Sequence, residues 1–297
     1  MMNRAEQNWP DSETITLDIP RCTGYMARHS NTVLIVNMSG GKDSVKMLGT
    51  LRQKYPTVRI IAVMADTGFE HVNPISAADF AKQICDSFNV ELHIVKNPNK
   101  TYLEMVERRG MFPSSATRQC TSDLKRGPIQ TWIRRAVKSG LITEKFIINC
   151  MGLRAQESPA RAKQPRFKKN VSLSKAGRMV WDWLPIHRDS LADVLQWHWT
   201  NNVPLHPVYV PEYHADKQAN SEFKGYLRRL SCRVCIFSTK ADLHAIYQRD
   251  RAAFDMVSNL ETKMNFTMRS GESLVQIITK PLNDSKQYGS EEELPCA

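Results

Sequence analysis

The stretch VLIVNMSGGKDSVKML, residues 33–48, decides the fold. Its first half is a continuous apolar run rich in β-branched residues, which is typical of a strand buried on both faces of a sheet. Its second half begins a pattern of helical period, with Val45, Leu48 and Leu51 on one face. Two bare glycines among small polar residues join the halves, either as a plain tight turn or as a cradle for an anion. The stretch therefore predicts a strand, a turn suited to a phosphate, and a helix.

The same alternation continues along the chain. Apolar runs of strand length alternate with amphipathic segments, which is typical of βαβ units. The predicted strands are 32–38, 58–66, 90–97, 145–152 and 179–187, and the predicted helices are 43–54, 73–88, 101–109, 122–140, 190–202 and 241–264. Pro74 suits the first turn of its helix, and Ser190 suits an N-cap. The alternation predicts an α/β fold with a doubly wound parallel sheet and a helical or irregular C-terminal part.

A change of pattern after residue 152 divides the chain into four predicted regions. We expect an irregular lead-in over 1–30 and, over 31–152, an α/β core that carries the turn suited to a phosphate. A helical and cysteine-bearing region, 153–265, is expected to pack on this core, and a polar tail covers 266–297. Within the third region, residues 155–178 are expected to form a basic loop.

The composition limits the partners of the chain. It has 297 residues, a formal net charge of +11 and a sequence pI near 9.4. This basic excess suits a polyanion such as nucleic acid, and a merely solvated surface is the alternative. No apolar run approaches the roughly 20 residues that span a bilayer, and the N-terminus lacks the apolar core of a signal peptide. We therefore expect a cytoplasmic protein without a membrane partner.

Polar residues after the first strand are expected to form the centre of a ligand site. Open parallel sheets bind ligands beyond the carboxyl ends of their strands. There, Gly40 and Gly41 let the backbone approach a phosphate, and the following helix N-terminus attracts its charge. Ser39 and Ser44 offer hydroxyl donors, and Lys42 offers a counter-charge.

Two further strand ends are expected to lie beside this turn. Asp66 and Thr67 end the second strand, where a ribose, an adenine edge or Mg²⁺ would lie, or where the chain simply turns in solvent. Gly152 and Arg154 follow the fourth strand. Arg154 and Arg161 carry the forked donors that grip phosphate or sulfate, and a surface salt-bridge cluster is the alternative.

The segment SGGKDS, residues 39–44, resembles the signature of the PP-loop, or N-type, ATP pyrophosphatases. The segments that resemble the phosphoadenylyl-sulfate (PAPS) reductase branch of that family are ADTGFEH (65–71), CTSDLKRGPI (120–129), GLRAQESPAR (152–161) and PIHRDSLADVLQWHWTNNVPLHPVY (185–209). The resemblance covers about residues 31–240. It implies an adenine nucleotide alpha-hydrolase-like fold that cleaves ATP between the α- and β-phosphates and adenylates an acceptor.

The resemblance also implies roles for individual residues. Lys42, Asp43 and Cys120 would be catalytic, and Asp43 would hold Mg²⁺. The residues expected to bind ATP or its phosphates are Ser39, Gly40, Gly41, Lys42, Asp43, Ser44, Asp66, Thr67, Gly152, Arg154 and Arg161.

Three of the seven cysteines form a candidate metal or sulfur site. Cys232 and Cys235 have chelate spacing, and Cys120 lies where the family has a cluster-related cysteine. Three thiolates can hold a [4Fe–4S] cluster with one open iron, or contribute to a zinc site, while a redox pair and unligated core cysteines remain alternatives. Gln119 stands where cluster-bearing adenylyl-sulfate reductases have a second cysteine. Cys296 lacks the ECGxH context of the catalytic cysteine in cluster-free PAPS reductases.

These features favour an ATP pyrophosphatase that activates an acceptor for sulfur transfer. The three-cysteine arrangement resembles the tRNA thiolation enzymes and the sulfur-inserting subunits of DNA phosphorothioation systems. ATP, Mg²⁺ and a [4Fe–4S] cluster are then the expected cofactors. Nucleic acid and a sulfur donor such as a cysteine desulfurase are the expected partners, and a homodimer is left open. The alternatives are a PAPS or adenylyl-sulfate reductase that releases sulfite, and a non-catalytic nucleotide-binding subunit in a phage or defence system.

Overall fold

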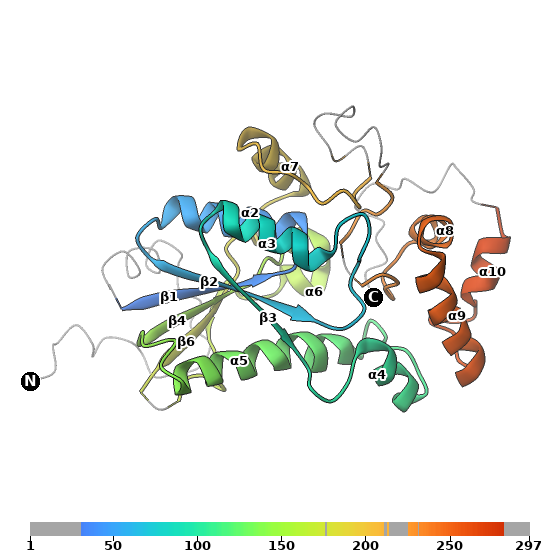
Figure 1. Cartoon of the computed structure of the whole chain (residues 1–297), viewed down its shortest axis with the longest axis horizontal. Helices are drawn as coiled ribbons and strands as arrows, with labels where there is room; N and C mark the ends of the chain where they lie inside the picture. Colours follow the sequence, from blue (N-terminus) through green and yellow to red (C-terminus); the bar gives the residue numbers. More distant parts are fainter. Residues whose placement is uncertain (1–30, 176, 211–212, 214–224, 231, 282–297) are drawn as a thin grey trace, which may run out of the picture.

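The computed structural model describes residues 31–175, 177–210, 213, 225–230 and 232–281. One sheet runs through its centre, with the strand order β3-β2-β1-β4-β6-β5 (Figure 1). Its strands are β1 (Thr32–Met38), β2 (Arg59–Asp66), β3 (Glu91–Lys96), β4 (Phe146–Cys150), β5 (Phe167–Lys169) and β6 (Met179–Trp183). Every pairing is parallel except that of β5 with β6. The predicted α/β class with a parallel-dominated sheet is confirmed.

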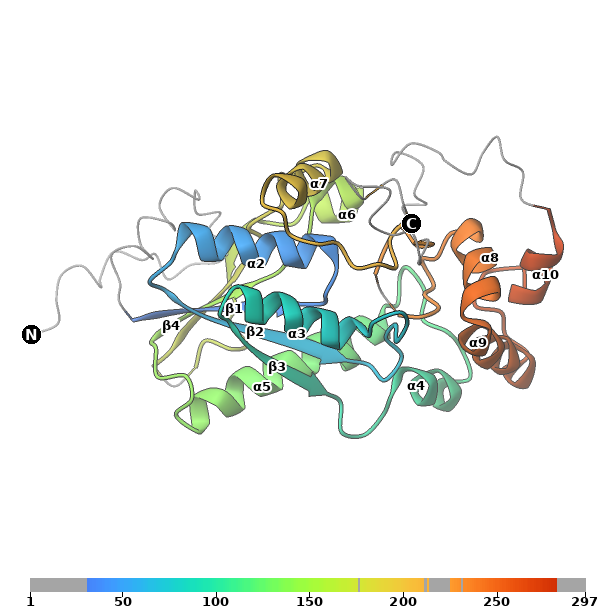
Figure 2. The same cartoon turned by 45° about the horizontal axis from the view of Figure 1, so that its top comes forward.

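Helices cover both faces of the sheet (Figures 1 and 2). Alternate residues of β1 point to opposite faces, as the strand geometry requires. Leu34 and Val36 join the core under α2 (Lys42–Lys54) and α3 (Ala77–Ser87), whereas Val33 and Ile35 join the core under α5 (Gly127–Lys138). The helix α7 (Leu191–Thr200) packs on α2.

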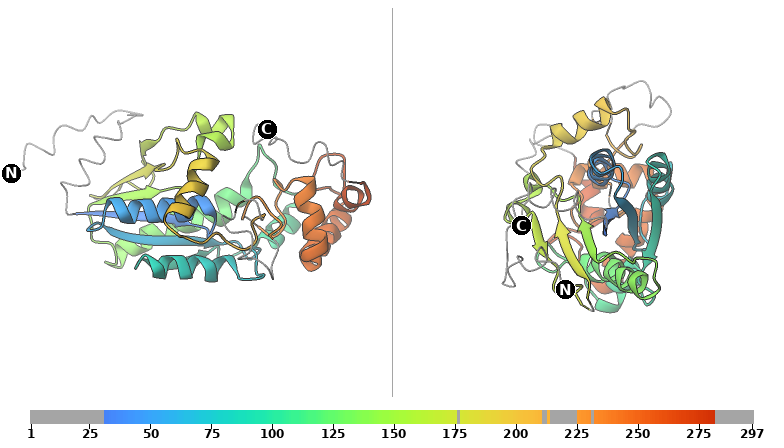
Figure 3. Two further views of the ribbon diagram at one scale, coloured as in Figure 1. Left: turned by 90° about the horizontal axis from the view of Figure 1, so that it is seen from above. Right: turned by 90° about the vertical axis from the view of Figure 1, so that its left-hand side faces the viewer.

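A third layer of helices lies beyond the carboxyl ends of the parallel strands (Figures 1 and 3). It consists of α4 (Tyr102–Arg109), the π-helical segment η2 (Cys120–Arg126), α8 (Lys240–Arg249), α9 (Arg251–Met264) and α10 (Leu274–Thr279). These elements share a core of their own, which includes Leu124, Leu243 and Phe254. None of the helices in the described ranges is long and apolar enough to cross a membrane.

The element boundaries differ from the predicted ones in the second half of the chain. The sheet continues past residue 152, because β6, which lies within the predicted strand 179–187, pairs with β4, and the unpredicted strand β5 pairs with β6. The segment expected to be a basic loop contains β5, the short turn η3 (Ala155–Glu157) and α6 (Pro159–Ala162). The predicted polar tail contains α10, whose Leu274 and Ile277 are buried.

Local capping explains two of the helix boundaries. The predicted helix 241–264 is interrupted at Asp250, whose side chain accepts the backbone N–H of Ala253 and starts α9. Pro74 was the wrong first-turn residue for α3, since Ser76 caps that helix through the N–H of Asp79. Ser190 is the N-cap of α7, as predicted.

Gly40 is expected to tolerate no side chain. Its φ is +73°, and an added Cβ would lie 2.9 Å from the carbonyl oxygen of Ala77. Gly40→Ala should therefore lower the free energy of unfolding by about 2–3 kcal/mol, from backbone strain together with this contact. Gly110→Ala is the matched control, because Gly110 has φ +67° but nothing within 4 Å of an added Cβ. Urea denaturation of both variants should show the larger loss for Gly40→Ala, and equal losses would contradict the close approach.

Candidate functional site

The candidate site lies where the sheet topology diverges. From β1, the chain order runs to β2 and β3 on one side and to β4 and β6 on the other. The carboxyl ends of β1 and β4 therefore mark the switch point of the sheet, which is where α/β sheets bind ligands in a crevice. Gly152, after β4, keeps these loops close, since an added Cβ would lie 3.4 Å from the backbone of Asp43.

The turn after β1 has the local geometry of an anion cradle. Gly41 is the N-cap of α2 and supplies no side-chain cap, so it leaves first-turn N–H groups to other partners. Ser39 and Ser44 bring their hydroxyl oxygens to 3.1 Å from each other. Ser44 also donates to the carbonyl oxygen of Gly41 at 2.9 Å, which fixes the turn. The hydroxyls and the helix start thus lie together, as the sequence predicts.

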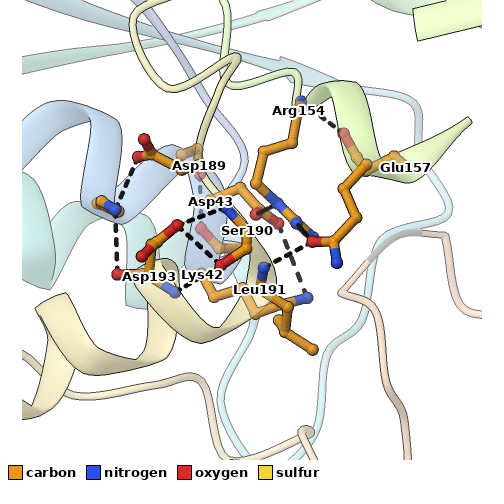
Figure 4. Close-up of polar contacts among 12 residues, drawn as sticks. Lys42, Asp43, Arg154, Glu157, Asp189, Ser190, Leu191 and Asp193 are labelled. Atoms are coloured by element: carbon orange, nitrogen blue, oxygen red, sulfur yellow. Dashed lines mark hydrogen bonds and ion pairs between the residues drawn. The ribbon is translucent and has the colours of Figure 1, made fainter. Parts of the chain in front are cut away.

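An ion-pair network links this turn to the loop after β4 (Figure 4). Arg154 Nε donates to Asp43 Oδ1 at 2.6 Å, and Lys42 Nζ lies 3.7 Å from Asp43 Oδ2. Burial alone would raise the pKa of Asp43, but the charges of Lys42 and Arg154 outweigh it and lower that pKa. Burial lowers the pKa of Lys42. The site therefore holds a carboxylate between two cationic side chains, beside the start of α2.

Arg161, the second predicted arginine, lies in the short helix α6 and is held there by an ion pair. Arg161 pairs with Glu157, and the Glu157 carboxylate also accepts the backbone N–H of Arg154 at 2.9 Å. His187 Nε2 lies 2.9 Å from the carbonyl oxygen of Arg161. Arg154 and Arg161 are thus both ion-paired at the crevice edge, and a direct contact of either with a phosphate stays a prediction.

Asp66 and Thr67 end β2 beside this crevice, in a turn that uses their polar groups. The Asp66 carboxylate accepts the N–H of Gly68 at 2.7 Å. Thr67 Oγ1 donates to Glu70 Oε1 at 2.5 Å, and the Thr67 N–H also points to the Glu70 carboxylate. Burial raises the pKa of Glu70. A nucleotide contact by Asp66 or Thr67 stays a prediction.

The three predicted cysteines lie near the turn that follows β2. The backbone of Cys232 pairs with that of Glu70, and its sulfur lies 4.0 Å from Thr67 Oγ1. Burial raises the pKa of Cys232 to about 12, with the positive charge of Lys125 opposing it and the thiols of Cys235 and Cys120 adding to it. Cys120 starts η2.

The iron–sulfur assignment of these cysteines stays a prediction. Within the described residues, no three His, Cys, Asp or Glu side chains are placed to hold a common metal ion. Cys120, Cys232 and Cys235 are close enough to influence one another's charge. Cys22 and Cys296 lie outside the described residues.

Two residues that the sequence did not single out contact Lys42 directly. Tyr209 accepts the backbone N–H of Lys42 on its hydroxyl oxygen at 2.9 Å, and Lys42 Nζ lies 5.1 Å from the centre of the Tyr209 ring. His198 Nε2 lies 2.9 Å from the carbonyl oxygen of Lys42. Tyr209 belongs to a proline-rich segment without hydrophobic periodicity. His198 belongs to a helix face whose tryptophans indicate a packing role. No local signal in the sequence identifies either contact.

Tyr209 belongs to a strap that lies over the turn, which we define as residues 208–210 and 225–230. Backbone hydrogen bonds join its two segments. The N–H of Leu227 donates to the carbonyl oxygen of Val208 at 2.8 Å, and the carbonyl oxygen of Leu227 accepts from the N–H of Val210 at 3.0 Å. Lys42 Nζ donates to the carbonyl oxygen of Arg228 at 3.3 Å. A small pocket beside the strap is lined by Leu227, Arg229, Cys235, Phe237, Ser238 and Asp242.

Comparisons with known proteins identify a phage protein and two solved structures that are similar to this chain. The chain is 24% identical over 285 residues to an uncharacterised 37.8 kDa protein of Escherichia phage 186, covering 82% of this chain and 78% of the phage protein. Among solved structures, the U34-tRNA thiolase NcsA from Methanococcus maripaludis with its [4Fe–4S] cluster superposes with a TM-score of 0.43 and 14% identity, covering 89% of this chain and 86% of the thiolase. The NH3-dependent NAD synthetase from Campylobacter jejuni superposes with a TM-score of 0.33 and 13% identity, covering 84% and 94%.

The sequence comparison with protein families gives the assignment. The phosphoadenosine phosphosulfate reductase domain matches residues 33–217, a range that contains β1, the turn, Arg154 and Tyr209. This range is more than half of the chain. The chain therefore belongs to the family of phosphoadenosine phosphosulfate reductase domains, whose enzymes carry out nucleotide-dependent, sulfur-related chemistry.

Proposed function

We propose that the chain is an ATP pyrophosphatase that adenylates an acceptor and then transfers sulfur to it. One observation carries this proposal: a single short segment contacts the phosphate turn and also carries Cys232. Arg228 in that segment accepts a hydrogen bond from Lys42 Nζ, and Cys232 follows four residues later, paired with Glu70. Nucleotide chemistry and sulfur chemistry would therefore share one crevice.

The first proposed step is adenylation. An oxygen of the acceptor attacks the α-phosphorus of ATP, and the bond to the β-phosphate oxygen breaks, so that pyrophosphate leaves. The cradle N–H groups, the Ser39 and Ser44 hydroxyls and Lys42 are placed to hold the negative charge of the leaving group. Mg²⁺ would enter with ATP as part of the substrate, and Asp43 offers a carboxylate beside the turn for it.

The second proposed step moves sulfur. A persulfide on one cysteine, supplied by a donor such as a cysteine desulfurase, attacks the activated carbon or phosphorus of the acceptor and displaces AMP. A second cysteine thiolate then attacks the resulting disulfide, which releases the thiolated acceptor and leaves a cysteine–cysteine disulfide. An external dithiol reduces that disulfide and restores both thiols. Cys232 and Cys235, separated by two residues, suit these two roles.

The charge distribution supports nucleic acid as the acceptor. Residues 158–178 contain no acidic side chain. For Lys163, Lys168, Lys169 and Lys175 no ion-pair partner is found among the described residues. This stretch begins at the crevice with α6 and continues along β5. Its uncompensated charge suits a phosphate backbone that passes the site.

The test is the release of pyrophosphate from ATP and Mg²⁺, measured with and without DNA or tRNA. We expect pyrophosphate release at a faster rate when the acceptor is present, with the AMP group transferred to the acceptor and set free once a persulfide donor is added. Release of ADP and orthophosphate would contradict the proposal, because it would place bond cleavage between the β- and γ-phosphates.

A sulfonucleotide reductase is the second candidate, and the family match over residues 33–217 favours it. In that case the anion cradle would hold a phosphate or sulfate of PAPS or its 3′-unphosphorylated analogue. Sulfite release from either compound with a dithiol reductant, without pyrophosphate release from ATP, would select the reductase.

A further inference from the structure

We infer that the Tyr209 hydroxyl is a phosphate ligand of the site, so that the strap takes part in nucleotide binding. This inference rests on the proposed function, because it names a further residue of the same nucleotide site. Tyr209 lies 167 residues after Lys42 in the chain, yet its hydroxyl meets the first N–H of α2.

The hydrogen bonds of the Tyr209 hydroxyl leave its proton directed elsewhere. The oxygen accepts the backbone N–H of Lys42 at 2.9 Å. A phenolic oxygen has two acceptor positions and one proton. Because the oxygen accepts from Lys42, the O–H points away from that N–H and is available as a donor to another group.

The surroundings of Gly41 show where the Tyr209 hydroxyl lies. A Cβ added to Gly41 would be 3.2 Å from the Tyr209 hydroxyl oxygen and 3.4 Å from Ser39 Oγ. The phenol and the serine hydroxyl thus both border the bare backbone of Gly41. The Tyr209 hydroxyl is therefore placed beside the Ser39 and Ser44 hydroxyls, at the turn suited to a phosphate.

The Tyr209 hydroxyl keeps its proton in this environment. The side chain is 1% exposed, and burial raises its pKa, so that the group is an O–H donor at neutral pH. Lys42 lies over the ring with its Nζ 5.1 Å from the centre, which adds positive charge next to the same donor. A neutral donor and a cation together suit a phosphate oxygen.

Tyr209→Phe tests this role, because it removes the hydroxyl and keeps the ring beside Lys42. The probes are pyrophosphate and adenosine, with dissociation constants measured by calorimetry on the full chain. We expect about a 10-fold weaker binding of pyrophosphate, the size expected for one lost hydrogen bond to a charged group, and unchanged binding of adenosine. Tyr247→Phe is the matched control, because Tyr247 lies on α8 against Phe254 and Arg251. It should leave both constants unchanged.

Two results would overturn the inference. Unchanged pyrophosphate binding would mean that the hydroxyl makes no contact, and tighter binding would mean that it occupies the position of a phosphate oxygen. If Tyr209→Phe fails to fold, amide hydrogen exchange of the wild-type chain decides: pyrophosphate should slow exchange at Leu227 and Leu230, and faster or unchanged exchange would contradict the inference. If the wild-type chain releases pyrophosphate from ATP and Tyr209→Phe binds pyrophosphate as tightly as the wild type does, the inference about Tyr209 fails. The proposed function would remain intact in that case.

Discussion

Asp43→Asn should reduce pyrophosphate release from ATP by roughly 10²- to 10³-fold, the size of loss seen when a charge-stabilising group is removed from an active site. The carboxylate lies 2.6 Å from Arg154 Nε and 3.7 Å from Lys42 Nζ, so its loss leaves two positive charges near the cradle without their partner. The substitution also removes a carboxylate that would lie beside an incoming Mg²⁺. The measurement is a steady-state assay of pyrophosphate, with ATP binding determined separately.

A structural effect must be separated from this catalytic one. Removing one partner of a buried ion pair costs on the order of 3 kcal/mol of stability. Asp189→Asn is the matched control, because Asp189 Oδ2 pairs at 2.7 Å with Lys46, a buried cation on the same helix (Figure 4). We expect the control to lose stability and to keep pyrophosphate release within about twofold of wild type. Full activity in Asp43→Asn would refute the assignment of Asp43.

Cys232→Ser should abolish sulfur transfer while pyrophosphate release continues. Serine preserves the size of the side chain but cannot carry a persulfide, so transfer should fall by at least about 100-fold. Adenylation needs the phosphate turn and not the thiol, so pyrophosphate release should stay within about twofold of wild type. The assay follows labelled sulfur from a persulfide donor into nucleic acid, alongside pyrophosphate.

Cys85→Ser is the matched control for this variant. Cys85 is fully buried in α3, and burial raises its pKa to about 12, as it does for Cys232. The control therefore removes a buried thiol that lies outside the crevice, and sulfur transfer should persist. If Cys232→Ser still transfers sulfur, Cys232 is not the carrier. If it loses both activities, the separation of the two steps is wrong.

The sequence predicts best what depends on neighbouring residues. The strand, turn and helix of residues 32–54 follow from hydrophobic period and glycine placement, and the structure has β1 and α2 within one residue of the predicted bounds. The meeting of Ser39, Ser44 and Arg154 at one sheet edge follows from parallel topology.

The rest depends on contacts between residues distant in the chain. Tyr209 reaches Lys42 only because the strap folds back over the turn, and no periodicity encodes that path. The break at Asp250 depends on one side chain that caps α9, which a continuous helical pattern hides. The arrangement of the cysteines likewise depends on how η2 and the strap pack, so spacing alone predicts candidates and not a ligating set.

The strand β5 has a consequence for the solubility of the folded chain. It ends the described sheet on one side, and an edge strand exposes backbone groups that can template pairing with another molecule. The strand is three residues long, and two of them are Lys168 and Lys169. Short length and positive charge both oppose the docking of a second strand. The same lysines that suit a polyanion thus protect the sheet from edge-to-edge aggregation, and replacing both with threonine should favour assembly into insoluble aggregates.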